Sequence, residues 1–400
     1  MSNIIIIGGG AAGMAAAVKA AETPDARVTL VERQSRPGRK LLATGNGRCN
    51  LTNTAAGSAE HYHGADPSFV LPALQKYPPA AVLEWFSSLG LMTVTEYGGR
   101  VFPLSGHAGS VLDVLRYALE RPNVSLVTGA AARRVTRGPA GIEVEWDGGG
   151  AAGDKLIVAC GGCAGAKLGG VSDGYEILKS LGHAVTPLRP ALTSLRTAPD
   201  YPRALKGVRA DAAVSLLRGG TVLARERGDV LFTDTGLSGT AVFALSRAAA
   251  PGQTAALDLF PDAPEAALCE DLKARRARWP ALPGNRILTG AAQSRLGQML
   301  CRYAGLSGGE TAGALDDAAL ARLARCVKDF RLPVTGVGGF DAAQATAGGA
   351  RTDEFDPETL QSRLVPGLYA CGEVLDVDGD CGGYNLQWAW ASGLLAGEAR

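Results

Sequence analysis

Near its N-terminus the chain reads Ile4-Ile5-Ile6-Ile7-Gly8-Gly9-Gly10-Ala11-Ala12-Gly13, an apolar run followed by closely spaced glycines. The isoleucines predict a strand buried on both faces, and the alanine-rich residues 11–21 predict a helix. Gly8 permits a sharp turn between them, Gly10 lets the backbone approach a pyrophosphate, and Gly13 lets helix and strand pack closely. The unpaired amides and the positive dipole end at the start of this helix favour phosphate there. The pattern therefore predicts a dinucleotide site in a Rossmann-like α/β domain.

A second apolar segment, Arg27-Val28-Thr29-Leu30-Val31, leads directly to Glu32. An acidic residue about twenty positions beyond the glycines, at the end of the second strand, accepts hydrogen bonds from ribose hydroxyls. Its negative charge also repels a 2′-phosphate. Glu32 is therefore the predicted ribose ligand.

The same glycine pattern recurs at Gly148-Gly149-Gly150-Ala151-Ala152-Gly153. This copy lies between the alternating residues 142–146 and the apolar residues 156–159, a setting that indicates a hairpin turn and not a helix start. Only the first copy is expected to bind a dinucleotide.

Composition narrows the class of protein. The chain has 400 residues, 46% of them hydrophobic and 20% charged, which is typical of a globular protein and excludes disorder. A net charge of +1 provides no overall field for nucleic acid or an anionic membrane, so neither partner is expected. The 54 glycines indicate many tight turns and close approaches to ligands. Eight cysteines are too sparse for a disulfide scaffold, and we expect reduced thiols in a cytoplasmic protein.

A basic, glycine-rich segment follows the second strand. Residues 38–53, GRKLLATGNGRCNLTN, resemble the HI0933-like family of FAD-dependent flavoproteins, relatives of the glutathione-reductase and fumarate-reductase folds. The family's pattern returns in residues 99–103, 159–162, 232–239 and 339–349. The resemblance thus covers nearly the whole chain and implies FAD as the cofactor.

The C-terminal region suits the other half of an FAD site. An apolar segment at 367–371 runs into Gly372 and Glu373, and residues 380–387 open a helix through Leu394. Helix amides near a reduced flavin would stabilise its negative charge. With the resemblance, the expected FAD contacts are Gly8, Gly10, Ala12, Gly13, Glu32, Arg33, Lys40, Thr44, Gly45, Arg48, Cys49, Asn50, Val135, Ala159, Gly161, Gly372, Glu373, Gly383, Asn385 and Leu386.

The middle of the chain predicts an inserted domain. Prolines at 187 and 190 mark a composition break, after which residues 191–262 alternate as in a β-sheet or barrel and residues 263–330 show helical spacing. The predicted FAD domain is therefore discontinuous, residues 1–190 and 331–400, with the chain returning near Pro333. The inserted domain, 191–330, is expected to cap the substrate cleft.

Several other patterns carry less weight. Cys160-Gly161-Gly162-Cys163 has redox spacing, but a dithiol reductase of this kind needs a second nucleotide unit that the chain lacks. The Gly-x-Ser-x-Gly sequences at Ser172 and Ser307 lack a histidine in the right order for a hydrolase. His61-x-His63 gives no zinc signature, and no metal is predicted. The cluster Arg275-Arg276-Ala277-Arg278 suits a solvated helix face.

The chemistry expected is hydride transfer between flavin N5 and a small organic substrate. Within the family, the resemblance implies either reduction of a C=C bond in an enone of steroid or bile-acid type by NAD(P)H, or oxidation of small amino ketones by dioxygen. Without a separate nicotinamide domain, NAD(P)H and substrate would visit the flavin in turn. Arg48, Arg100 and Tyr384 are the predicted polar groups near the ring, with Tyr384 as proton donor. An RNA-modifying flavoenzyme and a non-catalytic flavoprotein stay as alternatives, and the oligomeric state stays open.

Overall fold

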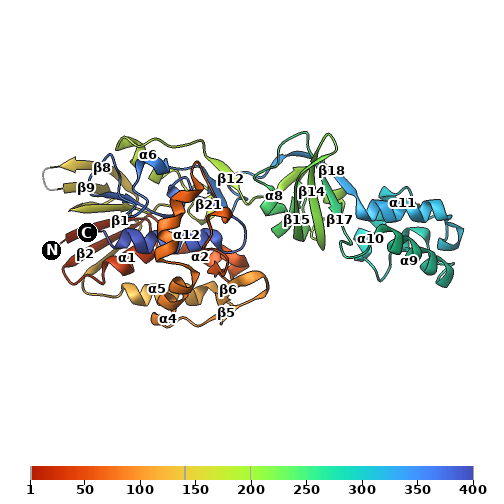
Figure 1. Ribbon diagram of the computed structural model, residues 1–400, viewed down its shortest axis with the longest axis horizontal. Coiled ribbons are helices and arrows are strands. Elements are labelled where there is room, and N and C mark those ends of the chain that lie inside the picture. The colour runs from red at the N-terminus through yellow and green to blue at the C-terminus, as the bar shows by residue number, and fades with distance from the viewer. Residues whose placement is uncertain (1, 139–140, 199, 400) are drawn as a thin grey trace. The chain divides into compact units, whose positions relative to one another are not determined.

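The computed structural model describes residues 2–138, 141–198 and 200–399, and the chain divides into two compact units (Figure 1). Unit 1 comprises Met1–Ala191 and Phe340–Arg400, and unit 2 comprises Leu192–Gly339. The C-terminal boundary of unit 2, at Gly339, differs from the sequence prediction, which ended the inserted domain at residue 330. Pro333 lies inside strand β18, Phe330–Val337, and this strand completes the barrel of unit 2, so the chain leaves that unit only after residue 339.

Unit 1 is built on a parallel five-stranded sheet of order β20-β11-β1-β2-β7. The strands are β1 (Ser2–Ile7), β2 (Ala26–Glu32), β7 (Val124–Thr128), β11 (Lys155–Val158) and β20 (Leu368–Ala370). Ile4 pairs with Val28 on one side and with Lys155 on the other, so the isoleucine run lies at the centre of the sheet. The predicted Rossmann-type parallel sheet is thereby confirmed. The apolar run suits β1 because a central strand of such a sheet is buried on both faces.

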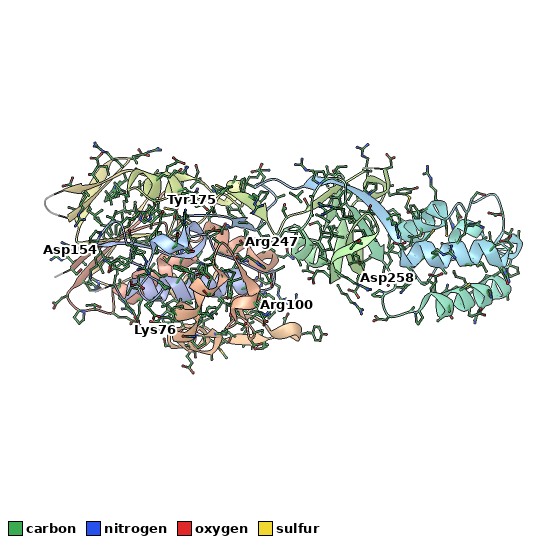
Figure 2. All side chains as sticks on the ribbon, turned by 45° about the horizontal axis from the view of Figure 1, so that its top comes forward. Lys76, Arg100, Asp154, Tyr175, Arg247 and Asp258 are labelled. Atoms are coloured by element: carbon green, nitrogen blue, oxygen red, sulfur yellow. The ribbon has the colours of Figure 1, made fainter. Side chains whose placement is uncertain are left out.

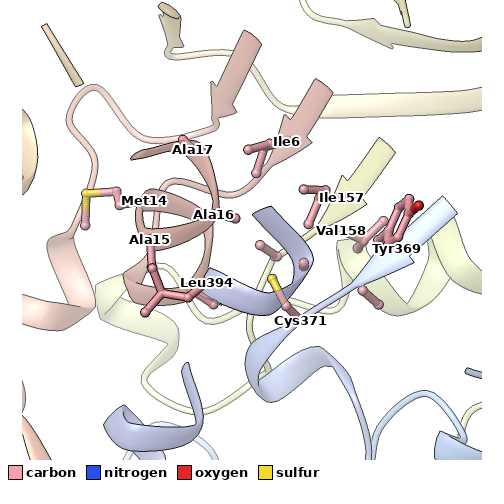
Figure 3. Close-up of a cluster of buried hydrophobic side chains, with 14 of the residues drawn as sticks. Ile6, Met14, Ala15, Ala16, Ala17, Ile157, Val158, Tyr369, Cys371 and Leu394 are labelled. Atoms are coloured by element: carbon pink, nitrogen blue, oxygen red, sulfur yellow. The ribbon is translucent and has the colours of Figure 1, made fainter. Parts of the chain in front are cut away.

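Helices α1 (Ala11–Ala20) and α12 (Tyr384–Gly397) pack against each other although they lie at opposite ends of the chain. A Cβ atom at Gly393 would lie 2.4 Å from the carbonyl oxygen of Ala12, and one at Gly397 would lie 2.6 Å from that of Ala16. Glycine is therefore required for the two backbones to approach so closely. Figure 3 shows Ala15, Ala16 and Leu394 in one buried cluster with Ile6 and Ile157.

The second glycine repeat forms a strand and not the turn itself. It is β10 (Gly149–Gly153), which pairs with β9 (Gly141–Trp146) beside β8 (Ala132–Gly138) in an antiparallel sheet. The apolar residues that follow belong to β11 of the main sheet. The hairpin prediction is thus correct in excluding a helix start, but the glycines pair through their backbones with β9.

Shorter elements complete the description of unit 1. Its further helices are α2 (Arg39–Ala43), α3 (Leu71–Lys76), α4 (Pro79–Ser88), α5 (Ala108–Leu119) and α6 (Asp173–Ser180). Its small sheets are β3-β6-β5 (Thr52–Asn53, Arg100–Pro103, Thr93–Thr95), β21-β4 (Asp378–Gly379, Tyr62–His63) and β12-β19 (Arg189–Ala191, Ala345–Ala347). The antiparallel pair β12-β19 flanks the point where the chain leaves and re-enters unit 1.

Unit 2 is a closed barrel of order β13-β16-β15-β14-β17-β18 with helices inserted before its last strand. The strands not yet given are β13 (Leu195–Thr197), β14 (Arg209–Arg218), β15 (Thr221–Phe232), β16 (Gly236–Ser238) and β17 (Thr254–Asp258). The helices are α7 (Asp200–Ala204), α8 (Thr240–Leu245), α9 (Glu265–Arg278), α10 (Ser294–Tyr303) and α11 (Asp317–Lys328).

A partly buried ion pair attaches helix α11 to the barrel. Lys328, at the end of α11, lies 2.8 Å from the carboxylate of Asp258, which Figure 2 labels at the end of β17. The ammonium group also donates to the carbonyl oxygens of Phe260 and Ala263 at 2.7 Å each. A charge largely removed from water is tolerated when its hydrogen-bonding capacity is filled in this way. Across the described parts of both units, no helix is long and apolar enough to cross a membrane.

We expect Gly393→Ala to destabilise unit 1, because the new methyl group would overlap the Ala12 carbonyl. The free energy of unfolding should fall by about 1–3 kcal/mol, the usual range for overpacking. Gly109→Ala is the matched control, since a Cβ there meets nothing within 4 Å in helix α5, and it should leave stability equal or slightly higher. Chemical denaturation of both variants checks this; equal stabilities would contradict the close contact.

Candidate active site

The glycine turn at the start of α1 is shaped by backbone contacts. Gly8 has φ +106°, and a Cβ there would lie 2.4 Å from the carbonyl oxygen of Ala159. A Cβ at Gly13 would lie 1.8 Å from the Gly8 oxygen, whereas one at Gly10 would meet nothing within 4 Å. Gly10 is the N-cap, no side chain caps the helix, and the first amides, including that of Ala12, have no intrahelical acceptor. The turn thus combines open space with unpaired donors, as a pyrophosphate requires.

Glu32 lies at the end of β2 and is 8% exposed. Its Oε2 accepts a hydrogen bond from the Gly9 amide, and its Oε1 accepts one from the Gln34 amide, both at 2.7 Å. These bonds fix the carboxylate beside the glycine turn. Because a carboxylate has about four acceptor sites, each oxygen can still accept a ribose hydroxyl.

Lys40 and Glu373 bring two distant parts of the predicted FAD site together. The Lys40 ammonium donates to Glu373 Oε2 at 2.8 Å, and Glu373 Oε1 accepts the Thr346 amide at 2.9 Å. A Cβ at Gly162 would lie 2.6 Å from Glu373 Oε1, so the turn at Gly161 belongs to the same place.

The C-terminal segment meets α1 through Gly372. Its amide donates to Ser392 Oγ of α12 at 3.0 Å, and a Cβ at this glycine would lie 2.9 Å from the Cβ of Ala12. The glycine turn, residues 372–373 and helix α12 therefore form one cradle.

The loop from Thr44 to Asn50 has unusual backbone geometry and a buried thiol. Gly45 has φ +56° and Cys49 has φ +58°. Burial raises the pKa of the Cys49 thiol to about 12, against the opposing effect of a hydrogen bond with Thr44. Cys49 is therefore a neutral thiol at pH 7 and not a charge-transfer thiolate. The Oδ1 atom of Asn50 is buried and has no hydrogen-bond partner among the described residues, so an acceptor is left for a ligand.

Helix α12 begins beside residues 52–53, which follow the Thr44–Asn50 loop. Its N-cap Gly383 has φ +107°, and a Cβ there would lie 2.5 Å from the Thr52 carbonyl carbon. The Asn385 side chain accepts the Gly379 amide at 2.9 Å and donates to the carbonyls of Gly379 and Asp380 at 2.7 and 3.3 Å. The loop of residues 379–383, called here the entry loop of α12, is thus held by the Asn385 side chain. Asn385 and Leu386 would therefore contact a cofactor through their backbone amides.

Two of the three predicted polar groups are arginines on or near strand β6. The Arg48 guanidinium lies 2.5 Å from Glu96 and 4.1 Å from the centre of the Phe102 ring. Burial raises the pKa of Cys381 to about 11, and Arg100, labelled in Figure 2, opposes this rise from close by. Arg100 therefore lies near the loop that enters α12.

The third group, Tyr384, is the first residue of α12 and is 7% exposed. Its ring lies 4.4 Å from the His61 ring, centre to centre, and 6.3 Å from that of Tyr62. Burial raises the pKa of Tyr384, and the nearby carboxylates of Asp380 and Glu60 raise it further. The phenol is therefore neutral at pH 7.

The other predicted contacts lie in the surrounding frame. Arg33 pairs with Asp173 at 3.1 Å and is half exposed, and Ala159 supports the glycine turn. Val135 lies in β8 with its side chain buried, so only its backbone is available to a ligand. These assignments stay predictions.

Asp380 and the two histidines of residues 61–63 are the group that sequence reasoning missed. Asp380 Oδ2 lies 3.1 Å from His61 Nδ1, and Oδ1 lies 2.7 Å from His63 Nε2. The spacing His-x-His was available as a signal, since it places two side chains on one face of an extended segment. Within the parts of the chain that the structure describes, no group of three or more His, Cys, Asp or Glu side chains is arranged to hold a metal ion.

The patterns set aside from the sequence have structural roles. Burial raises the pKa of Cys160 to about 12 and also raises that of Cys163, so neither is an activated thiolate.

His183 lies 2.8 Å from both Glu354 and Ser362. Ser362 Oγ also accepts the amides of residues 364 and 365, so its hydroxyl proton must point to His183. Both lone pairs of the Ser362 oxygen are thus engaged, and it cannot act as a nucleophile. The arrangement instead stabilises the loop that contains Ser362.

Comparison with known proteins agrees with the resemblance drawn from the motifs. The HI0933-like protein Rossmann domain matches residues 2–399. The chain is 40% identical over 406 residues to a 3-dehydro-bile acid delta(4,6)-reductase of Clostridium scindens, covering 100% of this chain and 99% of the relative. It is 31% identical to a ribosomal RNA dihydrouridine synthase of Escherichia coli, over 98% of this chain and 96% of that relative. The fold resembles the 3-ketosteroid delta1-dehydrogenase of Sterolibacterium denitrificans, with a TM-score of 0.53, 14% identity and 99% of each chain covered.

We expect Glu32→Ala to weaken FAD binding at least tenfold, because each hydrogen bond to a charged acceptor contributes about 1.5–3 kcal/mol. The FAD content of the purified protein, read from its visible absorbance, measures this, and circular dichroism checks the fold. Glu84→Ala, on the exposed face of α4, is the control and should retain FAD. Full FAD content in Glu32→Ala would remove the ribose assignment.

Proposed function

This chain belongs to the HI0933-like family and is an FAD-dependent oxidoreductase, and on that premise we propose that it reduces a carbon–carbon double bond conjugated to a carbonyl group. The proposed substrate is an enone of steroid or bile-acid type, and the proposed electron donor is NAD(P)H. The observation that carries the proposal is the 40% identity, along the full length of both chains, to a reductase acting on a 3-dehydro-bile acid.

FAD, when bound, supplies the hydride for this reaction. In the proposal, the amides at the start of α1 bind its pyrophosphate and Glu32 binds its ribose. The Lys40–Glu373 pair holds the two sides of the cradle together. The amides at the start of α12 stabilise negative charge on the ring, and the proton needed by the substrate comes from the entry of this helix, where Tyr384 lies.

A second candidate is reduction of uridine in RNA. It is favoured by the relative of 31% identity that is named a ribosomal RNA dihydrouridine synthase. Trp279 at the end of α9 is 44% exposed, with the Arg275 and Arg278 guanidinium groups 5.8 and 5.3 Å from its ring centre. An exposed ring beside arginines can stack on an unpaired base. Both candidates reduce a C=C bond next to a carbonyl, so they share the same chemistry and differ in substrate.

We expect anaerobic NADPH or NADH to bleach the visible flavin absorbance, and a 3-keto-4-ene steroid added afterwards to restore it. Restoration by uridine-containing ribosomal RNA alone would select the second candidate, and RNA binding should then weaken steeply with salt. Restoration by dioxygen alone, with an amino ketone bleaching the flavin, would replace both by the oxidase alternative. A flavin that no nicotinamide bleaches would contradict the proposed donor.

A further inference from the structure

The entry loop of α12 carries an acid–base arrangement that no predicted role uses. Asp380 lies three residues before Gly383, the N-cap of α12, and accepts hydrogen bonds from His61 on one carboxylate oxygen and His63 on the other. The two histidines come from the segment that pairs with β21, where Asp378 is opposite His63 and Gly379 is opposite Tyr62. The amide of Asp380 also donates to the His61 carbonyl at 2.9 Å.

The hydrogen bond with Asp380 fixes the tautomer of the His61 ring. A carboxylate only accepts hydrogen bonds, so His61 must carry its proton on Nδ1. Its Nε2 atom is then the second, chemically available nitrogen, and the side chain is 26% exposed. The nearest carboxylate to Nε2 is that of Glu60, at 3.6 Å, which is too far for a hydrogen bond. A carboxylate that orients an imidazole and leaves one nitrogen available is the arrangement of a general acid and base.

Asp380 is held in its charged form by this arrangement. Burial tends to raise its pKa, but the hydrogen bonds from His63 and His61, together with their charges, outweigh burial and lower the pKa. The other titratable groups facing the cluster are Glu60, Tyr62, Asp378, Cys381, Tyr384 and, beside Cys381, Arg100. Burial raises the pKa of Tyr62, so that phenol is neutral as well.

We propose that His61, positioned by Asp380, is the proton donor of the proposed reduction, and that Tyr384 provides the ring against which His61 packs. The inference rests on the proposed function and names the group that supplies its proton. Burial and two nearby carboxylates raise the pKa of the Tyr384 phenol and make it a poor proton donor, whereas the His61 imidazole is 26% exposed and has Nε2 available to pass a proton from solvent to substrate.

The step balances in atoms and charge. The substrate alkene accepts a hydride at the carbon distant from the carbonyl group and a proton at the adjacent carbon, so the C=C π bond is replaced by two C–H bonds. The imidazolium of His61 loses its Nε2 proton and becomes neutral, and water returns a proton to it. The two electrons come from the nicotinamide donor through FAD.

The test compares His61→Asn with Tyr384→Phe. Asparagine keeps an N–H donor for Asp380 but cannot carry a proton to substrate, and phenylalanine keeps the ring that contacts His61 without its hydroxyl. In stopped-flow measurements on the FAD-loaded protein, His61→Asn should slow the reoxidation of reduced enzyme by enone at least about 100-fold. Reduction by NADPH should stay within about twofold, because that half-reaction does not use the alkene proton. Tyr384→Phe should change reoxidation by less than about tenfold, and His107→Gln, at an exposed site before α5, should change neither half-reaction.

A second readout does not depend on turnover. Nitrogen chemical shifts of ¹⁵N-histidine in the wild type should show His61 protonated at Nδ1 when neutral, and Asp380→Asn should remove that preference. If Asp380→Asn does not fold, the wild-type spectrum and His61→Asn decide the question. A neutral His61 protonated at Nε2, unchanged reoxidation in His61→Asn, or a loss confined to Tyr384→Phe would overturn the proposal. A wild type that no enone or RNA reoxidises, with Nδ1–H on His61, would overturn the proposed function and retain the acid–base pair.

Discussion

The close approach of helices α1 and α12 is the contact on which the proposed cofactor cradle depends. Gly393 and Gly397 place the backbone of α12 against the carbonyls of Ala12 and Ala16, where any side chain would collide. Because the helices are this close, the amino end of α1, the segment at Gly372 and the C-terminal half of α12 meet although α1 and α12 are separated by most of the chain. The cradle is therefore a product of packing between small residues, and polar groups act within a geometry that packing has already set.

The carboxylates of the cradle accept hydrogen bonds from backbone amides. Glu32 accepts two amides, Glu373 accepts one amide and the Lys40 ammonium, and the helices contribute their unpaired first-turn donors. Each carboxylate is thereby held in a defined orientation. Such preorganised groups interact with a charged ligand without first reorganising, which makes their electrostatic effect large in a partly buried site.

The elements that could be predicted from sequence are those whose signals are local. The isoleucine run, the glycine turn, Glu32 and the final helix each depend on residues close together in the chain, and the structure contains them as expected. The strand nature of residues 149–153 was missed because glycines contribute no side-chain pattern. The predicted end of unit 2 near Pro333 was too early, because this proline lies inside strand β18. A strand can accept proline where no backbone donor is needed for pairing.

The Asp380–His61 pair could not be predicted for a different reason. It joins residues 319 positions apart, and the register between β21 and β4 decides which side chains meet. Neither strand is longer than two residues, so neither has a periodic signal. Sequence identified the residue types and their spacing, and only the fold identified the partner.

The antiparallel pair β12-β19 has a consequence for how the chain can vary. Arg189 is opposite Ala347 and Ala191 is opposite Ala345, so the segments of unit 1 that precede and follow unit 2 are paired in one ribbon. A module whose ends are adjacent can lengthen, shrink or be exchanged without moving the strands that flank it. Residues 192–339 can thus change in length and sequence during evolution while the parallel sheet of unit 1 is inherited unchanged.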